Sequence, residues 1–392
     1  MRIEELQALA GRYAIDTYAR APVEFVRGEG AWLWDSDGRR YLDFFAGLSV
    51  HNAGHCHPDI VAAICGQAAK LAGSSNLFYS EPALRLCERL AESSLGGKVF
   101  LCNSGAEASE CVIKLVRKHA HARGIERPEI VTLDAGFHGR TLGALAATSK
   151  LAREDLFGPL PPGFVAVARD DPDALRAAVG GSTAAVMLEP IQGEAGVLPV
   201  SDEMLIAARE ACDAVGATLV FDEVQCGMGR TGTLWAYEQL PVRPDALTSA
   251  KALGGGLPVG AVVTTPELGE VFDRGDHGST FGGAPIAAAA ALAALAVIDD
   301  PELLAGVRAL GERFRSGLAA IPGVVEVRGR GLMVGMSLAR GIDAAAAATG
   351  ALSEGLVVNV PRPGMLRFLP PLTIGEVEVD RAVAILTTAT RN

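Results

Sequence analysis

The sequence of 392 residues has no long apolar run and no excess of basic side chains. A membrane-spanning helix needs roughly 18 or more apolar residues in succession, whereas the alanine-rich run Ala284–Val297 is shorter and predicts a packed helix. The formal net charge of -11 is opposite in sign to the basic surface that a nucleic-acid partner requires. The N-terminal residues, MRIEELQALAGRY, contain acids and no long apolar region, so we expect no secretory signal there. We therefore expect neither a membrane nor a nucleic acid as a partner.

Cysteine is sparse and irregularly spaced. The seven cysteines include no pair separated by two residues. An odd number with scattered spacing favours reduced thiols, and therefore a cytoplasmic location, over a disulfide framework. The triplet His55-Cys56-His57 contains metal-binding residue types, but no second cluster of matching ligands accompanies it. We therefore expect no metal site.

The chain has enough apolar residues for a large core. Hydrophobic residues make up 49% of the sequence, and 46 glycines indicate many tight turns. Its length predicts two or three domains. Strand and helix patterns alternate in the middle of the chain, which predicts an α/β unit with a mostly parallel sheet flanked by helices. Both ends suggest one smaller α+β unit, so we predict boundaries that divide the chain into 1–50, 51–290 and 291–392.

Several elements can be predicted individually. Val23–Phe45 alternates apolar and polar residues around turn signals, which predicts an antiparallel hairpin or meander. Asp202–Val215 has helical spacing. We interpret Leu156–Phe164 as a connection because it is rich in proline and glycine, and we predict a strand over Leu356–Val360.

Two apolar segments end in charged residues. The run Ala217–Phe221 is followed by Asp222 and Glu223, and a second short run ends in Lys251. Strand ends of this kind lie at the sheet edge where α/β proteins bind ligands. A lysine that forms a Schiff base with an aldehyde, beside an acid that pairs with a protonated pyridine nitrogen, is the pyridoxal phosphate (PLP) arrangement. The alternative is that Asp222 caps a turn and Lys251 is a solvated loop residue.

Two further turns have the residues of a ligand site. Ser104 follows a short strand and precedes a helix, so its hydroxyl and the first helix amides favour an anion. The alternative is a plain capped helix, with Glu107 at the capping-box position. The loop after the next strand contains Phe137, which can cover a flat ring, and Arg140, which can hold a carboxylate through two parallel bonds. Its alternative is an ordinary surface loop.

The chain as a whole resembles the class III aminotransferases of PLP fold type I, and most closely their acetylornithine aminotransferase branch. Ten segments occur in the family's order and cover nearly the whole chain: GRRYLDFFAGLSV, SSNLFYSEP, VFLCNSGAEASE, FHGRTLGALAAT, MLEPIQGEAGVLP, LVFDEVQCGMGRTG, SAKALGGGLPVGA, HGSTFGGAP, VRGRGLMVG and LRFLPPL. Each segment is only moderately specific by itself, but ten in order are highly specific.

The resemblance implies PLP as cofactor and assigns roles to individual residues. Lys251 would hold PLP as a Schiff base and transfer protons, and Asp222 would keep the ring nitrogen protonated. The other cofactor contacts would be Ser104, Gly105, Ala106, Phe137, Val224, Gln225 and Thr280.

The resemblance also implies how substrates bind. Arg140 and Arg367 would bind substrate carboxylates, and Glu194 would mask Arg367 when no α-carboxylate is bound there. Ser279, with Thr280, would come from the second subunit of a homodimer with shared active sites.

The activity implied is transfer of the terminal amino group of N2-acetylornithine to 2-oxoglutarate. Alternative donors are succinylornithine, ornithine, 4-aminobutyrate or an acylated lysine precursor. Two other classes, a PLP aminomutase and a non-catalytic PLP-binding protein, are disfavoured by Arg367 and by the intact Lys251 and Asp222, respectively. The chain departs from the family pattern at Ala195, Ala284, Ala72-Gly73 and Cys226.

Overall fold

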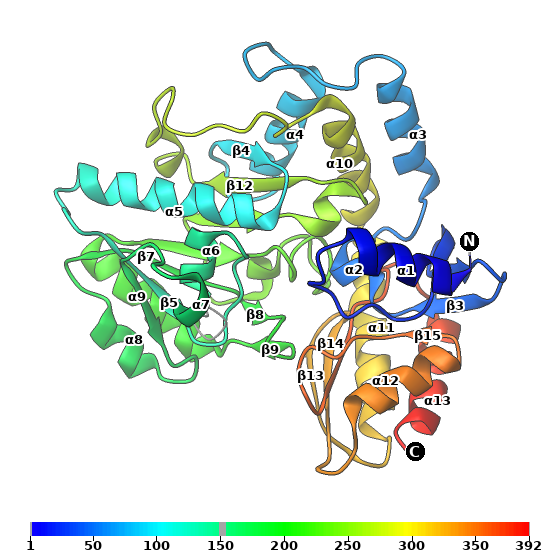
Figure 1. Cartoon of the computed structure of the whole chain (residues 1–392). Helices are drawn as coiled ribbons and strands as arrows, with labels where there is room; N and C mark the ends of the chain where they lie inside the picture. Colours follow the sequence, from blue (N-terminus) through cyan, green and yellow to red (C-terminus); the bar gives the residue numbers. More distant parts are fainter. Residues whose placement is uncertain (1, 149–153, 392) are drawn as a thin grey trace.

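The computed structural model describes residues 2–148 and 154–391. Figure 1 shows a large layered part built on one sheet and a smaller part that contains both chain ends. The two parts meet where the strands of the large sheet end, and the candidate site lies there.

The large part is built on a seven-stranded sheet with the order β4-β12-β11-β10-β7-β5-β6. Only β12 runs antiparallel to its neighbours, so the sheet is mixed but mostly parallel, as predicted. Its strands are β4 (Val99–Cys102), β5 (Glu129–Leu133), β6 (Phe164–Val167), β7 (Thr183–Leu188), β10 (Thr218–Asp222), β11 (Ala246–Ser249) and β12 (Gly260–Thr264). A separate short hairpin pairs β8 (Ile191–Gln192) with β9 (Leu198–Pro199).

Helices cover both faces of this sheet. The alternation of β10 shows how: Val220 belongs to the apolar cluster under α5 (Gly105–Ala122), whereas Phe221 belongs to the cluster under α9 (Asp202–Val215). Because side chains alternate with a period of two, Asp222 returns to the face of α5, at the strand end. The remaining helices of this part are α3 (Pro58–Ala68), α4 (Glu81–Glu92), α6 (Leu142–Ala147), α7 (Glu154–Phe157), α8 (Pro172–Ala178) and α10 (Pro285–Ile298), with short 3-10 turns at Ala236–Gln239, Lys251–Gly254 and Leu268–Glu270.

The smaller part joins the two chain ends through strand pairing. Leu42 of β3 pairs with Leu356 of β15, so the N-terminal meander and the C-terminal segment form one sheet. That sheet contains β1 (Phe25–Glu29), β2 (Trp32–Asp35), β3 (Arg40–Asp43) and β15 (Leu356–Val357), and a second contains β13 (Val324–Arg330), β14 (Met333–Leu338) and β16 (Met365–Phe368). The helices are α11 (Pro301–Ala319), α12 (Ala344–Ser353) and α13 (Glu376–Ala389). The boundaries near residues 50 and 290 stay a proposal.

Most predicted elements are confirmed, and the differences have local causes. The antiparallel meander and the helix Asp202–Val215 are present as predicted. Strand β6 was missed because it is a short edge strand that begins inside the expected connection. The expected strand over 356–360 stops at Val357, because Asn359 pairs with Arg367 of β16 instead.

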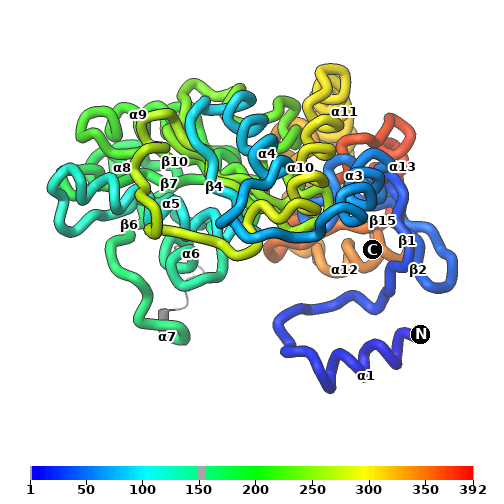
Figure 2. Tube along the Cα trace, turned by 90° about the horizontal axis from the view of Figure 1, so that it is seen from above, coloured from blue at the N-terminus to red at the C-terminus, as the bar shows by residue number. Residues whose placement is uncertain are grey.

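Two N-terminal elements, α1 (Ile3–Tyr13) and α2 (Ala46–Ser49), differ from the other helices. Helix α1 has no buried residue and stands away from the body at the end of an extended segment (Figure 2). The short turn α2 has positive φ at all four residues, so it is left-handed.

None of the helices in the described ranges is both long and apolar enough to cross a membrane.

Candidate active site

A cavity of about 470 Å³ lies at the carboxyl ends of the parallel strands. This volume suits a cofactor-sized ligand. Nine of the predicted site residues line it: Ser104, Gly105, Ala106, Phe137, Arg140, Asp222, Val224, Gln225 and Lys251. They come from the ends of β4, β5, β10 and β11, so the parallel sheet brings together segments that are far apart in the sequence.

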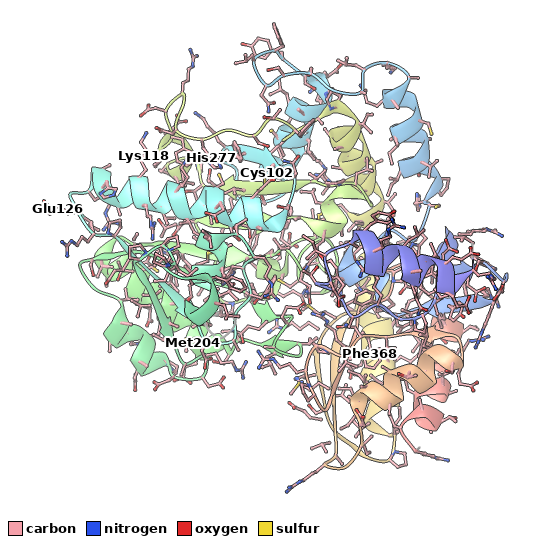
Figure 3. The ribbon with its side chains drawn as sticks, in the orientation of Figure 1. Cys102, Lys118, Glu126, Met204, His277 and Phe368 are labelled. Carbon is pink, nitrogen blue, oxygen red and sulfur yellow. The ribbon has the colours of Figure 1, made fainter. Side chains whose placement is uncertain are left out.

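The N-terminus of α5 forms one end of the cavity, next to the strand end marked by Cys102 (Figure 3). Ser104 is the N-cap and accepts a hydrogen bond from the Glu107 amide at 3.2 Å. The Glu107 carboxylate accepts from the Asn103 amide at 2.7 Å, one residue before the position of a standard capping box. A side chain at Gly105 would meet Val224 Cγ1 at 2.9 Å, so only glycine lets this turn approach so closely. The first helix amides and the helix dipole favour a bound phosphate here.

Lys251, Asp222 and His138 form what we call the basal cluster. Asp222 is 4% exposed and accepts hydrogen bonds from the Val224 amide and the Thr248 hydroxyl, both at 3.1 Å. Its other oxygen lies 2.7 Å from His138 Nδ1. Burial alone would lower the pKa of His138, but the hydrogen bond and charge of Asp222 outweigh burial and raise it. The acid is therefore held rigidly in a buried, polar setting.

Lys251 begins a 3-10 turn with φ of 52°, a left-handed conformation that is costly for a residue with a Cβ. Burial and the positive charge of Arg367 lower the pKa of Lys251, and Glu194 partly offsets them. A lowered pKa increases the fraction of neutral amine, the form that attacks a carbonyl group.

Glu223, the neighbour of Asp222, has a different environment. It accepts hydrogen bonds from the amides of Ala236 at 2.6 Å and Tyr237 at 2.9 Å, away from the cavity lining. Burial raises the pKa of Glu223 to about 8. Of the two acids at this strand end, only Asp222 faces the cavity.

The loop with Phe137 and Arg140 is fixed from two sides. Glu189 accepts hydrogen bonds from the amides of Phe137 at 2.8 Å and Gly193 at 3.1 Å. Burial raises the pKa of Glu189 above its usual range. On the other side, Glu110 of α5 accepts from the Gly143 amide at 2.9 Å. Arg140 itself is exposed, and its guanidinium lies 5.4 Å from the Phe137 ring centre.

A second group, the carboxylate cluster, consists of Glu194, Gln225, Asn359 and Arg367. Arg367 is 1% exposed and donates from Nη1 to Glu194 at 2.6 Å and to Gln225 at 3.1 Å. Its Nε and Nη2 donate to Asn359 Oδ1 at 3.1 and 2.7 Å. Burial alone would raise the pKa of Glu194, but the charge and hydrogen bond of Arg367 outweigh burial and lower it. Only Gln225 of this cluster lines the cavity, so it connects the ion pair to the ligand space.

Four predicted residues do not line this cavity: Glu194 and Arg367, which belong to the carboxylate cluster, and Ser279 and Thr280. Ser279 and Thr280 line a separate cavity of about 470 Å³, together with Glu107 of α5 and His277. Their loop is tied to the neighbouring loop 74–79, because Asn76 donates to the carbonyls of Ser279 and Gly282 at 2.9 Å. Within one chain, Ser279 and Thr280 therefore line a different cavity from Lys251.

Sequence reasoning missed His138, Glu189 and Asn359. His138 lies between Phe137 and Arg140 in a motif already singled out, and Glu189 follows the end of β7, so both positions were detectable. Asn359 had no such signal, since its role depends on pairing with β16. His55, from the triplet with metal-binding residue types, pairs with Asp43, with Nε2 and Oδ2 2.7 Å apart. Among residues 2–148 and 154–391, no three His, Cys, Asp or Glu side chains are grouped to hold a metal ion.

Comparison with known proteins places this site in context. The family Aminotransferase class-III matches residues 14–390. An acetylornithine aminotransferase of Caldanaerobacter subterraneus subsp. tengcongensis is 46% identical over 380 residues, covering 96% of each chain. The N-acetylornithine aminotransferase structure from Stenotrophomonas maltophilia K279a has a TM-score of 0.84 at 41% identity and covers 97% of each chain. An ornithine aminotransferase structure from Toxoplasma gondii, with PLP at partial occupancy in its active site, has a TM-score of 0.94 at 35% identity and covers 99% of this chain and 94% of that one.

Proposed function

We propose, on the premise that this chain belongs to the class III aminotransferases, that it transfers the terminal amino group of N2-acetylornithine to 2-oxoglutarate. The products would be N-acetylglutamate 5-semialdehyde and glutamate, a step of arginine biosynthesis in the cytoplasm. The names of relatives that match almost the whole chain support this donor over ornithine.

The cavity fits PLP. The α5 N-terminus with its glycine-only approach suits the phosphate, Phe137 and Val224 lie on the cavity wall, and the buried Asp222 suits a protonated ring nitrogen. When bound, PLP supplies an aldehyde that condenses with amines and a ring that withdraws electrons from the substrate. The task of Asp222 is to keep its negative charge at the ring nitrogen, and His138 holds it there. Lys251 would hold the cofactor and, once released, move a proton at the substrate carbon.

The observation that carries the proposal is the ion pair between Arg367 and Glu194. Arg367 is 1% exposed, whereas the Glu194 side chain is 28% exposed and so has room to leave. A donor that reacts through its terminal amine keeps its α-carboxylate far from the reacting carbon, and Glu194 then neutralises Arg367. Glutamate reacts through its α-amine, so its α-carboxylate lies close to that carbon and would replace Glu194 on Arg367. Arg140, at the exposed mouth, would bind the distant carboxylate of both substrates.

The site would be completed by a second copy of the chain. Within one chain, Ser279 and Thr280 line a different cavity from Lys251, and their loop and the neighbouring loop 74–79 expose the apolar side chains of Phe281 (72%) and Phe78 (73%). We therefore propose a homodimer in which these loops contribute to the partner's cavity.

The test is a single-turnover experiment with PLP-loaded enzyme and a panel of amines, in which products are quantified after rapid quenching. We expect N2-acetylornithine to react fastest through its terminal amine and glutamate through its α-amine. Faster reaction with ornithine, succinylornithine or 4-aminobutyrate would reassign the donor. A rearranged amine formed without 2-oxoglutarate would instead indicate an aminomutase.

A further inference from the structure

Asn359 is fixed directly opposite Arg367 by backbone pairing. The two residues exchange hydrogen bonds, from the Arg367 amide at 2.8 Å and from the Asn359 amide at 3.3 Å, in an isolated antiparallel bridge. On its other side Arg367 pairs with Gly335 of β14, which has no side chain. Asn359 is therefore the one side chain that the pairing of β16 places beside the guanidinium group.

Three side-chain oxygens accept hydrogen bonds from Arg367, and those of Asn359 and Glu194 differ in charge and freedom. Asn359 Oδ1 is neutral, and both of its contacts, to Nε and Nη2, lie on one edge of the guanidinium. Glu194 is charged and partly exposed, and it contacts Nη1 from a different segment of the chain. Arg367 thus has a neutral partner on its Nε edge, Asn359, whereas its Nη1 donates both to the neutral Gln225 and to Glu194, the one charged partner among these three.

The neutrality of the fixed partner matters because Arg367 is buried. A guanidinium presents five N–H donors in a rigid plane. An amide oxygen on the Nε edge sets the direction of that plane without cancelling its positive charge. A carboxylate at the same place would pair with the arginine permanently, since a buried pair with good geometry is costly to separate.

We propose that Asn359 determines the carboxylate specificity of the site: it holds Arg367 by the Nε edge with a neutral acceptor, so that the charge stays available to either Glu194 or a substrate α-carboxylate. This inference rests on the proposed exchange of Glu194. It makes Asn359 a positioning residue that selects which half of the reaction can proceed, without contact with the reacting atoms.

The decisive variant is Asn359→Asp, which adds one negative charge with almost no change in shape. We expect the glutamate half-reaction to lose at least about tenfold in kcat/KM, mainly through a raised KM, because Arg367 is then always neutralised. The N2-acetylornithine half-reaction should change by less than about twofold. The ratio of the two kcat/KM values does not depend on the folded fraction, so the change in preference can be measured even if the variant is partly unfolded.

A binding measurement supplies a second readout. Glutarate has two carboxylates and no amino or keto group, so its affinity for the PLP-loaded enzyme can be measured by calorimetry without turnover. We expect Asn359→Asp to weaken glutarate binding by about tenfold. Asn359→Ser, which shortens the acceptor but adds no charge, should weaken it less. The control Thr349→Asp places the same charge on the exposed surface of α12 and should leave both half-reactions unchanged.

A third measurement combines Asn359→Asp with Glu194→Ala in one chain. If Asn359→Asp already neutralises Arg367, then Glu194→Ala should have little further effect in that background, although it changes donor preference in the wild-type chain. Unchanged glutarate affinity and an unchanged half-reaction ratio in Asn359→Asp would overturn the inference. Failure of the proposed function would show differently, as absence of the terminal-amine half-reaction in the wild-type enzyme.

Discussion

The basal cluster and the carboxylate cluster are built in different ways. Asp222 ends a strand of the large sheet, and Lys251 and His138 follow two other strands of that sheet. Asp222 has three fixed donors within hydrogen-bonding distance. The carboxylate cluster instead joins the segment after β7 to the C-terminal part of the chain, where Phe368, next to Arg367, is labelled in Figure 3. Its central contact is an ion pair with one partly exposed partner.

The difference indicates a division of labour. Fixed, buried contacts suit the chemical step, which is the same for every amine, because preorganised charges need not reorient during reaction. An exchangeable ion pair suits the choice between substrates that place their carboxylates differently. Changes in the basal cluster should therefore affect both half-reactions alike, and changes in the carboxylate cluster should separate them.

The largest expected effect follows Lys251→Ala. Without the amine, neither half-reaction has a group to transfer the proton, so both should fall below detection while the chain still folds and retains PLP without a covalent link. Product assays of each half-reaction, with absorbance of the bound cofactor as the control for loading, check this. Turnover at the wild-type rate in either half would contradict the assignment.

Asp222→Ala should slow both half-reactions by about 10²–10³-fold, the size expected when one preorganised electrostatic contact is removed. The matched control is Glu223→Gln, because Glu223 follows Asp222 directly but contacts the amides of Ala236 and Tyr237. Quenched-flow rates per PLP-loaded active site should be near wild type in the control. Equal losses in the two variants would mean that Asp222 is only structural.

A smaller and opposite split is expected for Glu194→Ala. Arg367 would then be free at all times, so α-amino donors should gain by a few-fold and N2-acetylornithine should lose, because an unpaired buried charge is costly while that donor is bound. Competition between the two donors in one reaction gives the ratio directly. A ratio equal to that of the wild type would leave Glu194 without a role in selection.

The smallest expected effect is a change in stability with pH, and it concerns Glu223. Burial raises its pKa from 4.5 to about 8, so the folded chain holds a proton that the unfolded chain loses between these values. The stabilisation is complete below about pH 4.5 and is lost as the pH rises through about 8. We expect a decline of roughly 2–4 kcal/mol in the free energy of unfolding between pH 5 and 8. Denaturant midpoints across this range should become flatter in Glu223→Gln, and an equally steep decline there would exclude Glu223 as its source.

Much of the basal cluster could be predicted from the sequence because the signals are local. An apolar run followed by Asp222 predicts both a strand and its end, and Ser104 before a helical pattern predicts the N-cap that the structure shows. Yet the local pattern alone does not decide between the adjacent acids Asp222 and Glu223, and only the family resemblance singles out Asp222. The period-two alternation that places Asp222 on the face of α5 and directs Glu223 elsewhere is visible only once β10 is registered between its neighbours.

The carboxylate cluster was harder to predict because its contacts span the chain. Arg367 and Glu194 were named only through the family resemblance, and Asn359 was read as part of a strand that ends two residues earlier. The position of Asn359 depends on an isolated bridge to β16, which no local sequence pattern predicts. Likewise, β6 was missed because an edge strand of four residues has little burial pattern to detect.

The most direct measurement is of both half-reactions in Arg367→Ala, by rapid quenching of single turnovers with glutamate and with N2-acetylornithine. If the arginine is reserved for the α-carboxylate, the glutamate half should fall by at least about tenfold while the N2-acetylornithine half stays within about twofold of wild type. Equal losses in both halves would contradict the division between the basal and carboxylate clusters.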